Sequence, residues 1–244
     1  MAARKPHHPP EPGAWLAPAG GDPAPIFGDR AIAGFGERSF YVAVVPRHVA
    51  CRLVVEHHYS RRVVANSYVH LGVFHAGRLR GVLQWGYALN PSRMSRVVAG
   101  TASIDYLELN RMWLSDLCPR NSESRAIGFA LAYVRRAMPH VRWVQSFADE
   151  RCGRLGVVYQ ASNFLYVGCH DTEFYELDGE WFHKLLVTAK RKGGERGVTI
   201  RAGLDRATRH RFRQYRYVRF LHPGARRHLR LAVLPYPKPS AAGQ

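Results

Sequence analysis

The stretch LELNRMWLSDLCPRNSESRAIGFALAYVRRAM, residues 107–138, and VRWVQSFAD, residues 141–149, together decide the fold class. Leu107 to Leu114 predicts a strand, and CPRNSES supplies turn and capping residues. Apolar residues then recur at helical spacing and predict an amphipathic helix that ends near Pro139. RWVQSFA predicts a buried strand. The helical positions are Ile127, Ala130, Leu131, Val134 and Met138.

The flanking sequence extends this strand, helix, strand pattern in both directions. Upstream, we expect order to begin near Phe40 with the strand YVAVV, and Pro46 suits the first turn of a helix that runs to about His57. SYVHLGVF and LRGVLQWG, joined by HAGR, predict a β-hairpin. Downstream, GVVYQASNF predicts a short helix and FLYVG a strand. The chain is therefore predicted to be α/β, with a mixed central sheet flanked by helices that places ligands at strand ends.

Composition divides the 244 residues into three parts. Residues 1–36 are rich in Pro and Gly and predict a disordered arm, and residues 37–183 predict the main domain. Residues 184–244 predict a basic C-terminal extension, because Lys184 to Arg230 holds 15 Lys or Arg against only Glu195 and Asp205. Aromatic residues are interleaved with these cations. The residues predicted to contact nucleic acid are Lys190, Arg191, Lys192, Arg211, Arg213, Tyr215, Arg216 and Arg219.

Charge and cysteine usage narrow the class of protein further. Lys and Arg number 36 against 18 acidic residues, and the formal charge of +18 predicts a polyanionic partner, with nucleic acid first. No apolar run approaches the roughly 18 residues that span a bilayer, and there is no secretory signal, so a cytoplasmic protein without a membrane partner is expected. The four cysteines form no CxxC pair, which argues against a zinc finger.

Several long, irregular blocks resemble the Mom family of phage DNA-modification proteins. They are the stretch quoted above, VRWVQSFADERCGRLGVVYQASNF, HHYS at residues 57–60, NSYVHLGVF, GRLRGVLQWG and QYRYVRFLHPGARRHLRLAVLPYPK. The resemblance runs in order from about Val55 to Lys238. It implies an enzyme of the phage-infected bacterial host that converts adenine in DNA to N6-carbamoylmethyladenine, which protects the DNA from restriction nucleases. It also implies a fold similar to GCN5-related N-acetyltransferases for residues 37–183.

One block departs from the acetyltransferase pattern. In ordinary members of that superfamily, a Gly-rich loop after the fourth strand wraps the pyrophosphate of acetyl-CoA with backbone N–H groups. Here PRNSESRAIG holds no glycine before Gly128. Ser122 and Ser124 at the helix N-terminus are the remaining candidates for binding a phosphate of acetyl-CoA, of another carbon donor or of DNA.

The product that the resemblance implies also constrains the chemistry. Acetylation joins nitrogen to a carbonyl carbon, whereas carbamoylmethylation joins it to a methylene carbon, so a redox-active metal is one physical solution. The family is associated with iron, and an Fe²⁺ site is expected at His58, Tyr59 and Asp149. His57 is expected to point elsewhere, because adjacent residues face different directions. The residues expected to act in catalysis are Arg111, Ser124, Asp149 and Tyr159.

Each candidate also has a structural interpretation. His58 suits a helix end, Asp149 the cap of the next turn, Tyr159 the core and Ser124 the helix cap. Arg111, on a strand among apolar residues, needs a partner, for which Glu108 or a phosphate is available. The functional reading requires HHYS and SFAD to line one cavity.

Double-stranded DNA with the target adenine flipped out is the expected partner, and a homodimer is left open. Two alternatives remain at this point. One is a conventional acyl-CoA N-acyltransferase acting on a small amine or protein, and the other is a non-catalytic DNA-binding protein.

Overall fold

The computed structural model describes residues 15–18, 32–88, 90–153, 155–188 and 194–238. Its strands are β1 (Trp15–Pro18), β2 (Ile32–Gly36), β3 (Phe40–Val44), β4 (Ser67–His75), β5 (Arg78–Gly86), β6 (Tyr106–Leu114), β7 (Trp143–Asp149), β8 (Leu165–Leu177), β9 (Glu180–His183) and β10 (Thr208–Phe220). Its α-helices are α1 (Arg47–His57), α2 (Ser122–Ala137), α3 (Val157–Ala161), α4 (Lys184–Thr188) and α5 (Gly194–Ala202). Short 3-10 helices are η1 (Pro91–Arg96), η2 (Glu150–Cys152) and η3 (Pro223–His228).

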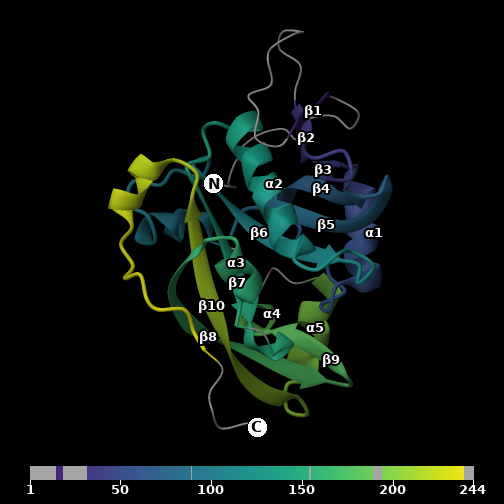
Figure 1. Cartoon of the computed structure of the whole chain (residues 1–244). Coiled ribbons are helices and arrows are strands. Elements are labelled where there is room, and N and C mark those ends of the chain that lie inside the picture. Colours follow the sequence, from purple (N-terminus) through teal and green to yellow (C-terminus); the bar gives the residue numbers. More distant parts are fainter. Residues whose placement is uncertain (1–14, 19–31, 89, 154, 189–193, 239–244) are drawn as a thin grey trace.

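The described strands form one mixed sheet in the order β1-β2-β3-β4-β5-β6-β7-β10-β8-β9 (Figure 1). Most neighbours are antiparallel, but β6 and β7 run parallel because α2 connects them. The mixed sheet flanked by helices that the sequence predicts is confirmed. So are the strand at Leu107 to Leu114, the following helix and the hairpin of β4 and β5.

The last strand in the sequence is not the last strand in the sheet. β10 lies between β7 and β8 and is antiparallel to both. The predicted boundary at residue 183 therefore separates neighbouring strands of one sheet, and residues 208–220 are part of that sheet rather than an extension outside it. The high Arg content of β10 hides its alternation, because every second residue from Arg209 to Arg213 is an arginine.

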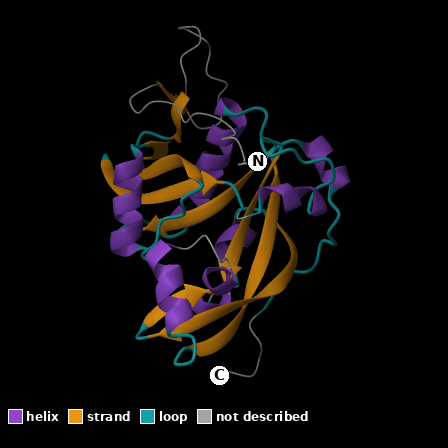
Figure 2. Cartoon of the chain, turned by 180° about the vertical axis from the view of Figure 1, so that it is seen from behind, coloured by secondary structure: helices purple, strands orange, loops and turns teal. Residues whose placement is uncertain are grey.

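Alternation along the strands explains how the sheet is covered on both faces. Val69, Leu71 and Val73 of β4 are fully buried and belong to the core cluster under α2, which contributes Ile127 and Ala130. On the opposite face, a second cluster joins α1 to the sheet and holds Val45, Ala50, Val54 and Val82. Figures 1 and 2 show α2 on one face and α1 on the other.

The N-terminal arm differs from the prediction where it is described. β1 and β2 pair in parallel, and β2 adds to the sheet beside β3, where Phe35 is 8% exposed in the core. Order therefore starts before Phe40. The rest of the predicted arm, residues 1–14 and 19–31, lies outside the described residues. Within the described part of the chain, no helix is long and apolar enough to cross a membrane.

Candidate active site

The parallel strands β6 and β7 separate at one end, and this separation creates the site. They pair only over Tyr106–Leu109 and Trp143–Ser146; beyond that point β6 continues beside β5 and β7 continues beside β10. A cavity of about 2590 Å³ opens between them. It is lined by the loop after α1, the ends of β6 and β7, the start of α2, and β8, β9 and β10. A ligand is therefore expected where diverging parallel strands leave their carboxyl ends free.

The segments HHYS and SFAD meet at this cavity, although they are far apart in the sequence. The hydroxyl of Tyr59 lies 3.5 Å from Oδ2 of Asp149, and the rings of His58 and Tyr59 are 4.3 Å apart between centroids. All three residues line the cavity. His57 instead stacks on Trp113 at 4.2 Å and is not among the lining residues, as adjacent positions at a helix end require.

Asp149 is held by an arginine two residues later. Its Oδ1 accepts hydrogen bonds from the backbone N–H and Nε of Arg151 at 3.0 and 3.1 Å, and its Oδ2 accepts another from Nε at 2.9 Å. Asp149 therefore caps η2, the structural role that the sequence left open. The guanidinium of Arg151 also lies 3.7 Å from the centre of the Phe174 ring. The carboxylate is thus fixed from the side of β8.

The donor atoms of His58, Tyr59 and Asp149 do not fit an iron site as they stand. Both carboxylate oxygens of Asp149 are engaged by Arg151. Nδ1 of His58 accepts the backbone N–H of Ser60 at 3.1 Å, so in the neutral ring Nε2 carries the proton and cannot donate a lone pair to a metal. Burial of the Tyr59 hydroxyl end, followed by Cys152 and Asp149, raises its pKa and opposes a tyrosinate ligand. Among the described residues, no three His, Cys, Asp or Glu gather as a metal-binding group.

Arg111 fastens the loop that carries His58 and Tyr59. Its Nε donates to the carbonyl of Arg62 at 2.9 Å, and its Nη1 donates to the carbonyl of Asn110 at 2.7 Å. The partner is thus backbone rather than the side chain of Glu108. Burial lowers the pKa of the Arg111 guanidinium, while the nearby Tyr59 and Glu108 raise it. Together with Arg111, burial lowers the pKa of His58 to about 3, so this imidazole is neutral.

Glu108 is a cavity residue that the sequence analysis considered only as a partner of Arg111. Gln145 Nε2 donates to its Oε2 at 2.6 Å, and Asn110 Nδ2 donates to its Oε1 at 3.2 Å. Burial nevertheless raises the pKa of the Glu108 carboxyl to about 7. An acidic residue between Leu107 and Leu109 on a predicted strand could have indicated a functional group. Its partner Gln145 lies on another strand, so the local sequence does not reveal the pair. The geometry gives a carboxyl group poised to exchange a proton near neutral pH.

The two serines predicted to bind a cofactor occupy different environments. Ser122 is 3% exposed and is not among the lining residues, whereas Ser124 lines the cavity. Ser124 Oγ donates to the carbonyl of Asn121 at 3.1 Å and caps no N–H group. Asn121 adopts a left-handed conformation with φ 66° and makes no side-chain cap. Ser124 and the first turn of α2 therefore stay available to a ligand.

Tyr159 combines the core role and the cavity role. It packs on Phe164 and Tyr217 at ring distances of 5.7 and 5.4 Å, yet it also lines the cavity. Burial raises the pKa of its hydroxyl, and a hydrogen bond with Ser146 lowers it. Aromatic side chains complete the wall on the side of β7 to β10, namely Phe147, Phe174, Trp181 and Phe212.

The residues predicted to contact nucleic acid do not form one surface in the structure. Lys190, Arg191 and Lys192 lie outside the described residues. Arg211 and Arg213 form ion pairs with Asp171 and Glu150, respectively. These ion pairs neutralise the charge of two arginines that the sequence predicted to bind DNA phosphates.

The remaining three residues lie closer to the core. Tyr215 is only 4% exposed and packs near Tyr166, so it has no face free for stacking on a base. Arg219 donates to the carbonyl of Asn163 at 2.7 Å. Arg216 lines the cavity with its guanidinium 5.0 Å from the Phe147 ring centre. Of the described members of this set, Arg211 and Arg216 line the cavity, and Arg211 does so while paired with Asp171.

Comparison with known proteins gives a consistent family assignment. Residues 39–238 match the model of the Mom protein family. A protein of Escherichia phage Mu named methylcarbamoylase mom is 56% identical over 210 residues, which cover 85% of this chain and 87% of that protein.

Solved acetyltransferases are more distant. An Arabidopsis thaliana protein in complex with acetyl-CoA is 12% identical, with a TM-score of 0.48, over 75% of this chain and 99% of that one. An N-acetyltransferase from Staphylococcus aureus is 9% identical, with a TM-score of 0.42, over 75% and 97%. At these TM-scores the likeness carries no argument about coenzyme or substrate.

Proposed function

Because the chain belongs to the Mom protein family, we propose that it is a phage DNA-modifying transferase that converts adenine to N6-carbamoylmethyladenine and so protects the DNA from host restriction nucleases. It acts inside the bacterial host. The observation that carries the proposal is the 56% identity to the phage Mu protein named methylcarbamoylase mom, over 85% of this chain and 87% of that protein.

The reaction replaces an N6–H bond with an N6–CH₂ bond, so the adenine amine must lose a proton. Glu108 is the group in the cavity best suited to accept it, because its carboxyl pKa near 7 leaves a carboxylate available at neutral pH. The nitrogen lone pair forms the new bond to the methylene carbon of a donor of the class X–CH₂–CONH₂, while the bond from that carbon to X breaks and X departs with the electron pair. Gln145 and Asn110 orient the carboxylate through the two hydrogen bonds that they donate.

The adenine has to leave the duplex to reach Glu108. In a base pair, N6 faces the major groove and is hydrogen-bonded to the opposite base, whereas Glu108 is half-buried on β6 and lines the cavity. Phe147, Trp181 and Phe212 line the same cavity and offer faces on which a flipped base can stack. Ser124 and the start of α2 offer hydrogen-bond donors to the carbon donor or to a phosphate.

Iron has no step in this proposal and stays a prediction from the resemblance. Metal analysis of purified wild-type protein beside the double variant His58→Ala and Asp149→Ala tests it directly. Iron bound by the wild type and lost from the double variant would reinstate these residues as ligands after a rearrangement of Arg151. Iron content shared by both proteins would place any metal elsewhere.

The experiment for the function is nucleoside mass spectrometry of DNA from cells that express the protein. Wild-type protein is expected to add one carbamoylmethyl group to a fraction of adenine, and Glu108→Gln is expected to abolish most of it. Glu195→Gln, at an exposed position on α5, is the matched control and should modify DNA normally. Unmodified adenine in the wild type would contradict the proposal, and an acetylated amine or protein would favour a conventional acyltransferase.

A further inference from the structure

Two short 3-10 helices from distant parts of the sequence lie side by side at one edge of the molecule. η1 and η3 each begin with a proline in the first turn. The segments that follow them are joined by backbone hydrogen bonds, from Ala99 N to the carbonyl of His228 at 2.8 Å and from Arg230 N to the carbonyl of Val97 at 2.9 Å. Val98 and Leu229 form an isolated bridge between them. The two segments are therefore one structural unit.

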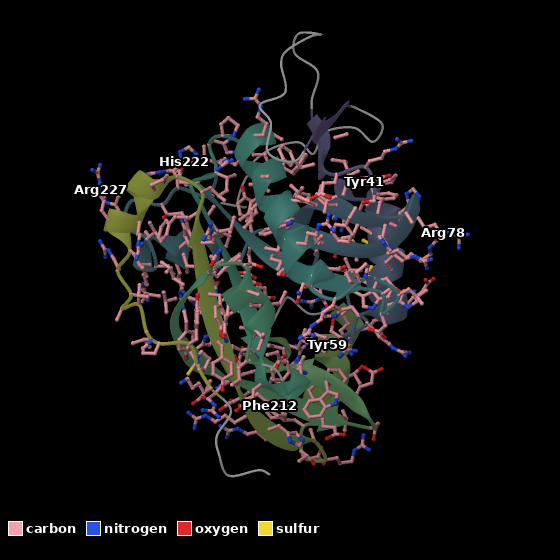
Figure 3. All side chains as sticks on the ribbon, in the orientation of Figure 1. Tyr41, Tyr59, Arg78, Phe212, His222 and Arg227 are labelled. Atoms are coloured by element: carbon pink, nitrogen blue, oxygen red, sulfur yellow. The ribbon has the colours of Figure 1, made fainter. Side chains whose placement is uncertain are left out.

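The geometry of η1 sorts its side chains into two rows. Residues three apart eclipse one another in a 3-10 helix. Met94 and Val97 accordingly share the buried side, with 6% and 2% exposure, while Arg93 and Arg96 share the exposed side. The same packing in η3 buries Ala225 at 1% exposure and leaves Arg226 and Arg227 exposed. Figure 3 shows Arg227 and His222 together at this edge, on the side opposite Arg78.

We call Arg93, Arg96, Arg226, Arg227 and Arg230 the arginine platform. All five are exposed. Within the described part of the chain, none of them forms an ion pair with a carboxylate, and Arg227 instead donates to the ring of its neighbour His228 at 3.1 Å. The platform is thus a concentration of positive charge without local compensation, which attracts phosphate groups.

The arginines of β10 provide a contrast on the same molecule. Arg209 pairs with Glu173, Arg211 with Asp171 and Arg213 with Glu150, while Arg206, just before the strand, pairs with Asp178. We call these four cations the β10 ladder. Their charge is partly cancelled by acids of β8, η2 and the turn after β8. Among the described residues, the cations of this Arg-rich strand therefore have carboxylate partners, whereas those of the arginine platform do not.

The platform adjoins the active-site cavity. Arg93 and Arg96 are among the residues that line it, and Met94 between them contacts Gln145, whose Nε2 lies 3.4 Å from the Met94 sulfur. The same Gln145 nitrogen holds the carboxylate of Glu108. A duplex lying across η1 and η3 would therefore present its backbone to the platform beside the entrance through which a flipped base reaches Glu108.

We propose that the arginine platform is the main phosphate-binding surface for duplex DNA, and that it grips the backbone next to the flipped adenine. The identity of the polyanion rests on the proposed function. The guanidinium groups suit this partner because each can donate two parallel hydrogen bonds to one phosphate. The β10 ladder contributes little to binding, since its cations already have carboxylate partners.

The test compares two quadruple variants of equal charge change in the full-length chain. The platform variant carries Arg93→Ala, Arg96→Ala, Arg226→Ala and Arg227→Ala, and the ladder variant carries Arg206→Ala, Arg209→Ala, Arg211→Ala and Arg213→Ala. Affinity for a short adenine-containing DNA duplex is measured over a series of salt concentrations. The slope of log affinity against log salt should fall by about 0.9 for each platform arginine lost. The ladder variant should keep nearly the wild-type slope and affinity.

Equal loss of slope in both variants, or a larger loss in the ladder variant, would overturn the platform proposal. A preference of the wild-type protein for single-stranded RNA over duplex DNA at equal salt would overturn it as well. A third variant with lysine at the four platform positions keeps the charge and should retain the slope, which separates charge from loss of folding. Because binding is read without turnover, a wild type that grips duplex DNA through the platform but leaves adenine unmodified would refute the proposed function alone.

Discussion

The hydroxyl of Tyr59 lies 3.5 Å from Oδ2 of Asp149, and this approach joins the loop after α1 to the end of β7. Tyr59 as a residue is 59% exposed, so its packing contributes little to the stability of the fold. The contact instead closes one side of the cavity over the point where β6 and β7 separate. The contact between Tyr59 and Asp149 therefore shapes the cavity more than it stabilises the core.

Tyr59→Phe is therefore expected to lower adenine modification by roughly tenfold, which corresponds to about 1.4 kcal/mol of transition-state stabilisation. The melting temperature should stay within the range of ordinary surface substitutions. Tyr41→Phe, on a ring that stacks on Phe74 outside the cavity, is the control and should leave activity unchanged. A melting point that falls in step with activity would assign Tyr59 a structural role.

Glu108→Gln should reduce the modification rate by about 100-fold or more, as expected when a positioned proton acceptor is removed. In the wild type, the rate should rise as the pH passes through about 7, because the carboxylate is the active form and burial has raised the carboxyl pKa to that value. The residual rate of Glu108→Gln should lack this step. A wild-type profile that is flat between about pH 6 and pH 8 would remove Glu108 from proton transfer.

The same carboxyl gives an independent stability measurement. Because its pKa is higher in the folded protein than in the unfolded chain, the folded state binds the proton more tightly between the ordinary carboxyl value and about 7. The free energy of unfolding should therefore lose this contribution as the pH rises through that window. Glu108→Gln should gain in melting temperature relative to the wild type between about pH 5 and pH 8. A constant difference would show that the folded-state carboxyl is not perturbed.

Arg111→Lys keeps the charge but cannot make both hydrogen bonds, to the carbonyls of Arg62 and Asn110. Each hydrogen bond from a charged group is worth about 1.5–3 kcal/mol, so some loss of stability is expected. Activity should fall further, by about 10- to 100-fold, because the loop with His58 and Tyr59 is no longer fastened to β6. Arg52→Lys, exposed on α1, is the control for the chemical change.

Gly156→Ala should destabilise the protein by roughly 2–5 kcal/mol, as measured by denaturant unfolding. Gly156 has φ +77°, and an added Cβ would lie 2.5 Å from Cε2 of Tyr217. Gly153→Ala separates the two causes, because Gly153 also has a positive φ, +63°, but an added Cβ there meets nothing within 4 Å. Its cost should be limited to about 1–2 kcal/mol of backbone strain. Equal losses would mean that Tyr217 moves aside without cost.

The elements that the sequence predicted well are those whose evidence is local. The hairpin of β4 and β5 has alternating apolar residues and a turn in which Ala76 and Gly77 both take positive φ, and α2 has a regular apolar stripe. The motifs HHYS and SFAD likewise located one side of the site. Segments that depend on distant partners were harder to place, because no pattern within them records which strand they will join.

β10 and Glu108 illustrate this limit. The arginines of β10 resemble a solvated, polyanion-binding stretch, and only the acids of β8, about 40 residues away, turn them into cross-strand pairs, such as Arg211 with Asp171. Glu108 is half-buried and is held by Gln145, which is 37 residues further on. No pattern in the sequence predicted a role for Arg93 and Arg96, because their exposure depends on how Met94 packs.

The position of β10 in the sheet determines when the sheet can be completed during synthesis of the chain. A chain leaves the ribosome from its N-terminus, and β7 and β8 meet in the sheet only through Thr208–Phe220, which emerge after every other described strand. Until then, the hairpin of β8 and β9 has no edge to join, and the wall that carries Phe174 and Trp181 is absent. A nonsense mutation ahead of residue 208 would thus remove the strand that joins β8 to β7, and with it the support for the cavity wall that carries Phe174 and Trp181.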